Sequence, residues 1–101
     1  MDNLGQIKPW SGYHRRILLE SAAVHNNLGV SYQKLYENTG DAEYQKESLV
    51  SLYKAGELVD IVGRERGKVQ YNINYILHPD IIRGDMAVNE DLSMNHRFIV
   101  R

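Results

Sequence analysis

The sequence predicts an α+β domain in which three helices precede a two-stranded β-hairpin. Two observations carry this prediction. In the first half of the chain, apolar residues recur every three or four positions, as on one face of a helix. After Gly56 the pattern changes to strict alternation over residues 69–75, which is typical of a strand with one buried face. A charged segment between glycines, residues 63–67, would form the tip of the hairpin.

The first two helices are predicted from apolar periodicity and from capping residues. Ile17, Leu18 and Ala22 fall near one face of a helix that starts at residue 13 and ends near residue 26, where two asparagines weaken it. Residues 28–30 are interpreted as a short break. Ser31 would then cap a second helix over residues 32–38, which ends at the following Thr-Gly pair.

The third helix is predicted to begin after Asp41, a residue that caps helix N-termini well. Leu49, Leu52 and Tyr53 follow at the spacing of one buried stripe. Gly56 would end this helix and bring the next strand back onto the core.

The hairpin and the ends of the chain complete the predicted domain. Residues 58–62 are rich in strand-forming types and would pair with residues 69–75. The chain therefore divides into an N-terminal arm (1–12), the three-helix and hairpin domain (13–78) and a C-terminal extension (79–101). The extension would pack on the core or on a second subunit.

Composition limits the classes of function. A chain of 101 residues with 43% hydrophobic residues suits one globular domain. The absence of cysteine excludes disulfides, thiolate metal sites and thiol nucleophiles. The four histidines are scattered, and no catalytic set or phosphate loop is present, so we expect neither an enzyme nor a cofactor nor a metal site. No apolar run suits a membrane span, and the N-terminus lacks a secretory pattern, so we expect a cytoplasmic location without membrane contact.

Charge is balanced overall and concentrated in one place. Twelve Lys and Arg residues stand against thirteen Asp and Glu, which argues against a general polyanion binder. The expected hairpin tip contains three cations and only one acid, Glu65; the cations are Arg64, Arg66 and Lys68. Alternate residues of a strand share a face, so the three cations would point the same way.

The predicted chain order is that of a winged helix-turn-helix. Residues 52–59 together with residues 63–73 resemble the end of the recognition helix and the wing of bacterial regulators of the arsenic-repressor and multiple-antibiotic-resistance-repressor type. The resemblance covers roughly residues 28–75, and the lack of cysteine means that metal sensing is not carried over. It implies sequence-specific binding of double-stranded DNA, as a small transcription regulator or as an accessory protein of plasmid or phage replication, partition or transfer.

The resemblance also implies DNA contacts. The third helix would lie in the major groove and the wing on the backbone or minor groove. The candidates for base contact, expected to be exposed on the third helix, are Tyr44, Gln45, Lys46, Ser48 and Ser51. Phosphate contacts are expected from Arg64, Arg66 and Lys68, and from Ser31 and Lys34. Any one helix residue could equally be ordinary solvated surface. A homodimer is expected, because one module reads few base pairs.

Two other interpretations stay open. Asn27-Leu28-Gly29 with Tyr32, then Gly40-Asp41 and a helix containing Ala55, is similar to a tetratricopeptide repeat, which would make the chain a helical protein-interaction module. The spacing after Tyr32 is longer than in the standard repeat, a solenoid needs about three repeats, and the alternation at 69–75 would be coincidence. A winged helix that binds only protein is the other alternative.

Overall fold

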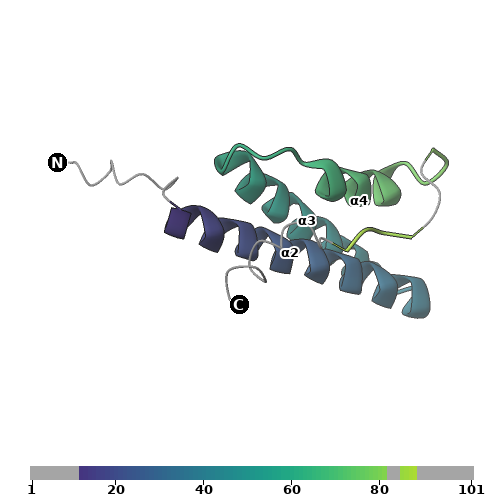
Figure 1. Ribbon diagram of the computed structural model, residues 1–101. Helices are drawn as coiled ribbons and strands as arrows, with labels where there is room; N and C mark the ends of the chain where they lie inside the picture. Colours follow the sequence, from purple (N-terminus) through teal and green to yellow (C-terminus); the bar gives the residue numbers. More distant parts are fainter. Residues whose placement is uncertain (1–11, 82–84, 89–101) are drawn as a thin grey trace.

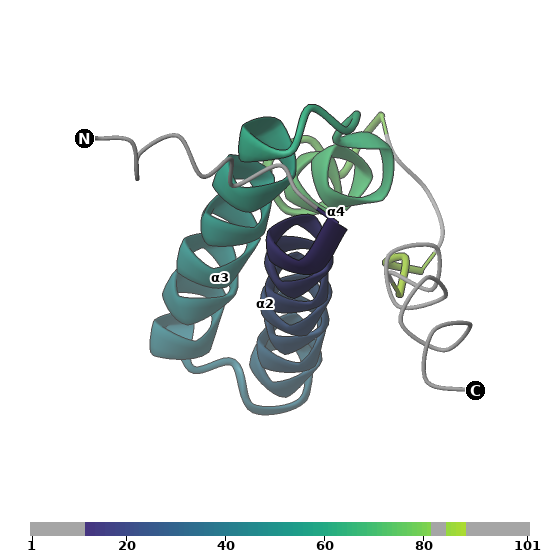
Figure 2. The ribbon, with the colours of Figure 1, turned by 60° about the vertical axis from the view of Figure 1, so that its left-hand side comes forward.

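The computed structural model describes residues 12–81 and 85–88, and its regular elements there are three helices. They are α2 (Gly12–Thr39), α3 (Ala42–Ile61) and α4 (Gly67–Leu77). In Figure 1, α3 runs back along α2, and α4 turns again and runs in the direction of α2. Figure 2 shows α4 set against the α2–α3 hairpin. Within the described residues, no helix combines the length and the apolar character that crossing a bilayer requires.

The predicted β-hairpin is wrong: residues 12–81 and 85–88 contain no strand. Residues 58–61 are the last residues of α3, Val62 is its C-cap, and residues 69–75 belong to α4. The alternating positions contain two pairs at the helical spacing i, i+4. Val69 and Ile73 are buried, while Tyr71 and Tyr75 are half-buried beside them. Seven alternating residues therefore fit either a short helix or a strand, and packing against α3 decides for the helix.

The two helices predicted before Gly40 are one continuous helix of 28 residues, α2. The Asn26 side chain makes buried hydrogen bonds to distant residues, so it does not compete for the helix backbone. Gly29 is buried against α3, and Ser31 is exposed in mid-helix. A glycine in a helix costs about 1 kcal/mol relative to alanine, which the tertiary packing outweighs.

The predicted start of the third helix is confirmed. Gly40 has a positive φ of 75°, and the Asp41 carboxylate accepts a hydrogen bond from the backbone N–H of Glu43 at 3.0 Å. The predicted end is wrong, because α3 continues through Gly56 to Ile61, and Gly63 (φ 76°) follows its end. Leu52 is buried as the apolar spacing requires, whereas Tyr53 is exposed.

The helices α2 and α3 approach each other closely at Gly29. A Cβ atom there would lie 2.6 Å from Cγ and Cδ2 of Leu52 and 3.2 Å from the backbone oxygen of Ser48. The Ser48 hydroxyl donates to the Gly29 carbonyl at 2.6 Å. Only glycine leaves room for this contact, which fixes how α2 sits on α3.

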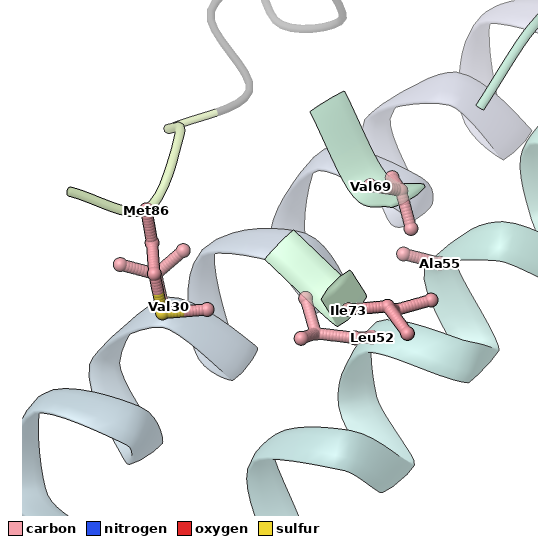
Figure 3. Close-up of a cluster of buried hydrophobic side chains, with 6 residues drawn as sticks. All are labelled: Val30, Leu52, Ala55, Val69, Ile73 and Met86. Carbon is pink, nitrogen blue, oxygen red and sulfur yellow. The ribbon is translucent and has the colours of Figure 1, made fainter. Parts of the chain in front are cut away.

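The core consists of two clusters of buried apolar side chains. The first joins α2 to the end of α3, and its members are Leu19, Ala22, Ala23, Val59 and Val62. The second joins all three helices to a segment beyond them, and its members are Val30, Leu52, Ala55, Val69, Ile73 and Met86 (Figure 3). Met86 belongs to the predicted C-terminal extension, so part of that extension packs on the helical core.

Candidate functional site

A short stretch of non-helical chain, residues 85–88, lies against α2 and α4 (Figure 1, yellow-green). We call it the 85–88 segment, and we call the surface of α2 and α4 that holds it the α2–α4 groove. The groove residues with hydrogen bonds to the segment are Asn26, Asn72 and Tyr71. The contact therefore brings together parts of the chain that are up to 61 residues apart.

Asn72 of α4 holds the backbone of the 85–88 segment at two points. Its Oδ1 accepts a hydrogen bond from the backbone N–H of Ala87 at 2.6 Å, and its Nδ2 donates to the Ala87 carbonyl at 2.7 Å. Asn26 of α2 adds a longer hydrogen bond to the same carbonyl, 3.2 Å. The two asparagines are joined by a hydrogen bond of 3.0 Å, from Asn72 Nδ2 to Asn26 Oδ1.

Both asparagine side chains are completely buried. An amide buried without partners is strongly destabilising, so these two side chains depend on the peptide unit that they bind. Removing the 85–88 segment would leave the Oδ1 of Asn72 without the donor it now has. The groove therefore needs a backbone, or water, in this position.

The side chains of the 85–88 segment make further contacts on either side of Ala87. Met86 is buried in the second core cluster and lies next to Val30 of α2 in Figure 3. The Asp85 carbonyl accepts a hydrogen bond from the Tyr71 hydroxyl at 3.1 Å. The segment is thus held by one apolar side chain and by backbone groups of two residues.

A polar cluster continues the groove further along α2. The Tyr75 hydroxyl donates to Oε2 of Glu37 at 3.1 Å, and Gln33 Nε2 donates to the same oxygen at 3.3 Å. Burial raises the pKa of Tyr75, and the Glu37 carboxylate raises that pKa further, so the phenol stays a proton donor at neutral pH.

Gln33 is the residue of this cluster whose bonding capacity is not used fully. Its side chain is buried, and Oε1 has no hydrogen-bond partner among the residues that the structure describes. The groove therefore offers a buried acceptor beside the part that the 85–88 segment fills. A donor from a bound chain would remove the desolvation penalty of this oxygen.

The cations expected on a wing lie instead at the turn between α3 and α4. The Arg66 guanidinium forms an ion pair with Asp60 at 2.8 Å and packs over Gly56, where a Cβ would lie 2.9 Å from its Cζ. The hydrogen bond between them raises the pKa of Arg66 and lowers the pKa of Asp60. Arg64 lies in the turn and Lys68 in the first turn of α4, both half-buried. Without a strand, alternation no longer places the three on one face.

The residues expected on a recognition helix divide into buried and accessible ones. Ser48 and Ser51 are buried, so the prediction that they are exposed is wrong. Tyr44 stacks on Tyr32 of α2 with ring centroids 6.3 Å apart, and Gln45 is half-buried. The exposed candidates are Lys46 on α3 with Ser31 and Lys34 on α2.

Sequence reasoning missed Asn26, Asn72 and Met86. Asn26 does not end its helix, and Asn72 does not face solvent from a strand. One signal was present: on a helix, Asn72 falls between Val69 and Ile73 on the buried face. A polar amide in the middle of an apolar stripe indicates a specific buried hydrogen bond.

The comparisons with known proteins add no relative: no family model, no curated protein and no solved structure matches this chain.

Proposed function

We propose that this chain is a helical protein-interaction module that binds an extended peptide in the α2–α4 groove. In the structure, the 85–88 segment of the same chain occupies that groove. The proposal gives the chain a binding role without catalysis, and the protein that supplies the peptide would be its partner.

The single observation that carries the proposal is the pair of hydrogen bonds between the Asn72 side chain and the Ala87 backbone, which we call the grip of Asn72. One side chain satisfies both the N–H and the carbonyl of the same residue, at 2.6 and 2.7 Å. Such a grip recognises backbone and not side chain, so it would hold any extended peptide whose neighbouring residues fit. Specificity would come from the apolar site that Met86 fills.

Gln33 supports the same proposal from an independent position. The 85–88 segment leaves the buried Oε1 of Gln33 without a partner among the described residues. A peptide that continued along α2 past Asp85 could donate a backbone N–H to this oxygen. A partner would then form one more hydrogen bond than the chain's own segment does.

The similarity to a tetratricopeptide repeat, drawn from residues 27–32, 40–41 and 55, favours an interaction module over a DNA reader. The close contact of Gly29 with Ser48 and Leu52 gives that similarity a packing role. The extra spacing after Tyr32 lengthens α2 to Thr39 and leaves the hairpin intact.

The experiment uses a labelled synthetic peptide that contains Asp85-Met86-Ala87-Val88, titrated into the full chain. The chain variant Met86→Glu, which removes the apolar anchor, should bind the peptide more tightly than the wild-type chain, because its own segment no longer fills the groove. Fluorescence anisotropy measures both affinities.

The matched control removes the grip and keeps the vacant groove. Adding Asn72→Ala to Met86→Glu should abolish peptide binding, whereas adding Asn74→Ala, an amide of the same helix that bonds Gln70, should not. Equal binding to both double variants, or no binding to Met86→Glu, would contradict the proposal.

DNA binding stays a prediction that the helical fold does not test. The observation relevant to it is that Lys34 and Lys46 are exposed. Titrating the chain with double-stranded DNA at two salt concentrations tests it, because phosphate contacts weaken as salt rises.

A further inference from the structure

The outward face of α2 carries apolar side chains that the described fold leaves in solvent. Ile17, Val24, Leu28 and Leu35 are 41% to 59% exposed. The buried residues of α2 lie on the opposite side of the helix, and they include Leu19, Ala22, Asn26, Val30 and Gln33. This face is therefore separate from the core and from the α2–α4 groove.

The exposed apolar residues follow a coiled-coil spacing. Together with two serines they are separated by alternating steps of four and three, which defines the a and d positions of a heptad repeat. We call these six residues the outer seam: Ile17, Ser21, Val24, Leu28, Ser31 and Leu35. At 1.5 Å per residue the seam is about 27 Å long, enough for several layers of a helix pair.

We propose that the outer seam is the interface at which two copies of this chain pair through antiparallel α2 helices. Read from either end, the seam has the order apolar, serine, apolar, apolar, serine, apolar. An antiparallel copy centred near Asn26 places Ile17 against the partner's Leu35. Ser21 then meets the partner's Ser31, and Val24 meets the partner's Leu28. Each layer joins like with like, and the two-fold symmetry repeats each of these contacts.

Charge beside the seam selects this occupant and its direction. Glu20 and Lys34 occupy equivalent heptad positions on the same edge of the seam. In the antiparallel pair each Glu20 lies opposite the partner's Lys34, and symmetry gives this pairing twice. A parallel pair would set Glu20 near the partner's His25 and Lys34 near the partner's Thr39, with no carboxylate opposite a lysine.

Glu20 can take part without leaving its present contact. Its carboxylate lies 4.0 Å from Arg16 within α2, and its side chain is 34% exposed. Lys34 is exposed and lies two heptads further along the helix. The interface is small and two of its six layers are serine pairs, so we expect a dimer that dissociates on dilution.

The first test is the oligomeric state of the full chain by sedimentation equilibrium over a wide range of protein concentrations. We expect a monomer–dimer equilibrium for the wild-type chain. Leu28→Glu should raise the dimer dissociation constant roughly a hundredfold, because it buries unpaired carboxylates in the seam. Val50→Glu is the matched control, since Val50 is 57% exposed on α3 and lies outside the seam.

Both positions are exposed, so the variants should keep the fold, and circular dichroism verifies this. A wild-type chain that stays monomeric at every concentration would overturn the proposal. So would a dimer that survives Leu28→Glu, or one that Val50→Glu weakens equally. Binding of the groove peptide is measured separately, so failure of this proposal and failure of the groove proposal are distinguishable.

The second test examines the charge pairing. Glu20→Lys and Lys34→Glu should each weaken the dimer by roughly twofold to tenfold, and the double variant should restore it. Single variants that leave the dimer unchanged, or a double variant weaker than both, would exclude the antiparallel alignment.

The third test fixes the direction, and it uses the fact that the chain has no cysteine. A mixture of the Ser21→Cys chain and the Ser31→Cys chain should form a mixed disulfide on oxidation. Each single variant alone should cross-link much more slowly. Efficient cross-linking of Ser21→Cys to itself would show a parallel pair and overturn the proposal.

Discussion

The helix α2 has two intramolecular interfaces, and they are built from different chemistry. Against α3 it uses hydrocarbon and a missing side chain: Gly29 lets Leu52 pack directly on the helix backbone. Against α4 and the 85–88 segment it uses the buried amide of Asn26, which bonds Asn72 of α4 and the Ala87 carbonyl, together with Val30, which clusters with Met86. The first interface depends on close packing around Gly29, whereas the second combines the buried Met86 side chain with hydrogen bonds to backbone groups that another extended peptide could also supply. One interface therefore maintains the fold, and the other is suited to exchange its occupant.

The largest effect should come from the apolar interface. Leu52→Ala removes a completely buried side chain, so we expect the free energy of unfolding to fall by about 2–5 kcal/mol. Chemical denaturation followed by circular dichroism measures it. Val50→Ala, at an exposed position of α3 outside the outer seam, is the control and should have a small effect. A Leu52→Ala loss no larger than that of the control would contradict the division between the interfaces.

The polar interface should respond locally rather than globally. Asn72→Ala removes both hydrogen bonds to Ala87 and leaves the buried Oδ1 of Asn26 without its donor, so we expect the free energy of unfolding to fall by about 1–3 kcal/mol. Hydrogen exchange at the Ala87 amide should accelerate far more than exchange in α3. If both regions accelerate equally, the 85–88 segment is part of the cooperative core and not an exchangeable occupant.

The close approach at Gly29 predicts an intermediate result. In Gly29→Ala, overpacking against Leu52 and Ser48 should outweigh the gain in helix propensity, for a net loss of about 1–2 kcal/mol. Gly67→Ala is the matched control, because a Cβ at Gly67 meets nothing within 4 Å. Thermal denaturation of both variants measures the difference, and a stabilised Gly29→Ala would show that the helices have room to spare.

The smallest effect should come from the Asp60–Arg66 ion pair at the α3–α4 turn. The pKa of Asp60 is lowered from 3.8 in the folded chain. The contribution of the ion pair to folding stability is therefore fully present above pH 3.8 and is lost as the pH falls through the lower pKa of the folded state. The stability difference between the wild-type chain and Asp60→Asn should therefore vanish in acid. A difference that grows as the pH falls would mean that another group is responsible.

Local signals predicted correctly the parts of the fold that local chemistry decides. Gly40 and Asp41 mark the turn between α2 and α3, because a positive φ and an acceptor side chain are needed there. Leu52 was placed in the core by its spacing.

The other parts of the fold, and the candidate site, depend on contacts between residues that are distant in the sequence. Gly29 and Gly56 do not interrupt the helices: each lies inside one, where a neighbouring side chain occupies the space of a Cβ. The strand predicted at 69–75 failed because its period also fits a helix. The groove was missed altogether, because Asn26 and Asn72 meet only when α2 and α4 are assembled.

The covalent link between α4 and the 85–88 segment sets how strongly a partner must compete. A segment tethered by a few residues is present at its own site at an effective concentration on the order of millimolar. A free peptide with the same intrinsic affinity would have to exceed that concentration to displace it. A cut in the chain between Leu77 and Asp85 would abolish the tether's advantage, and the groove would then become open to partners at far lower concentrations.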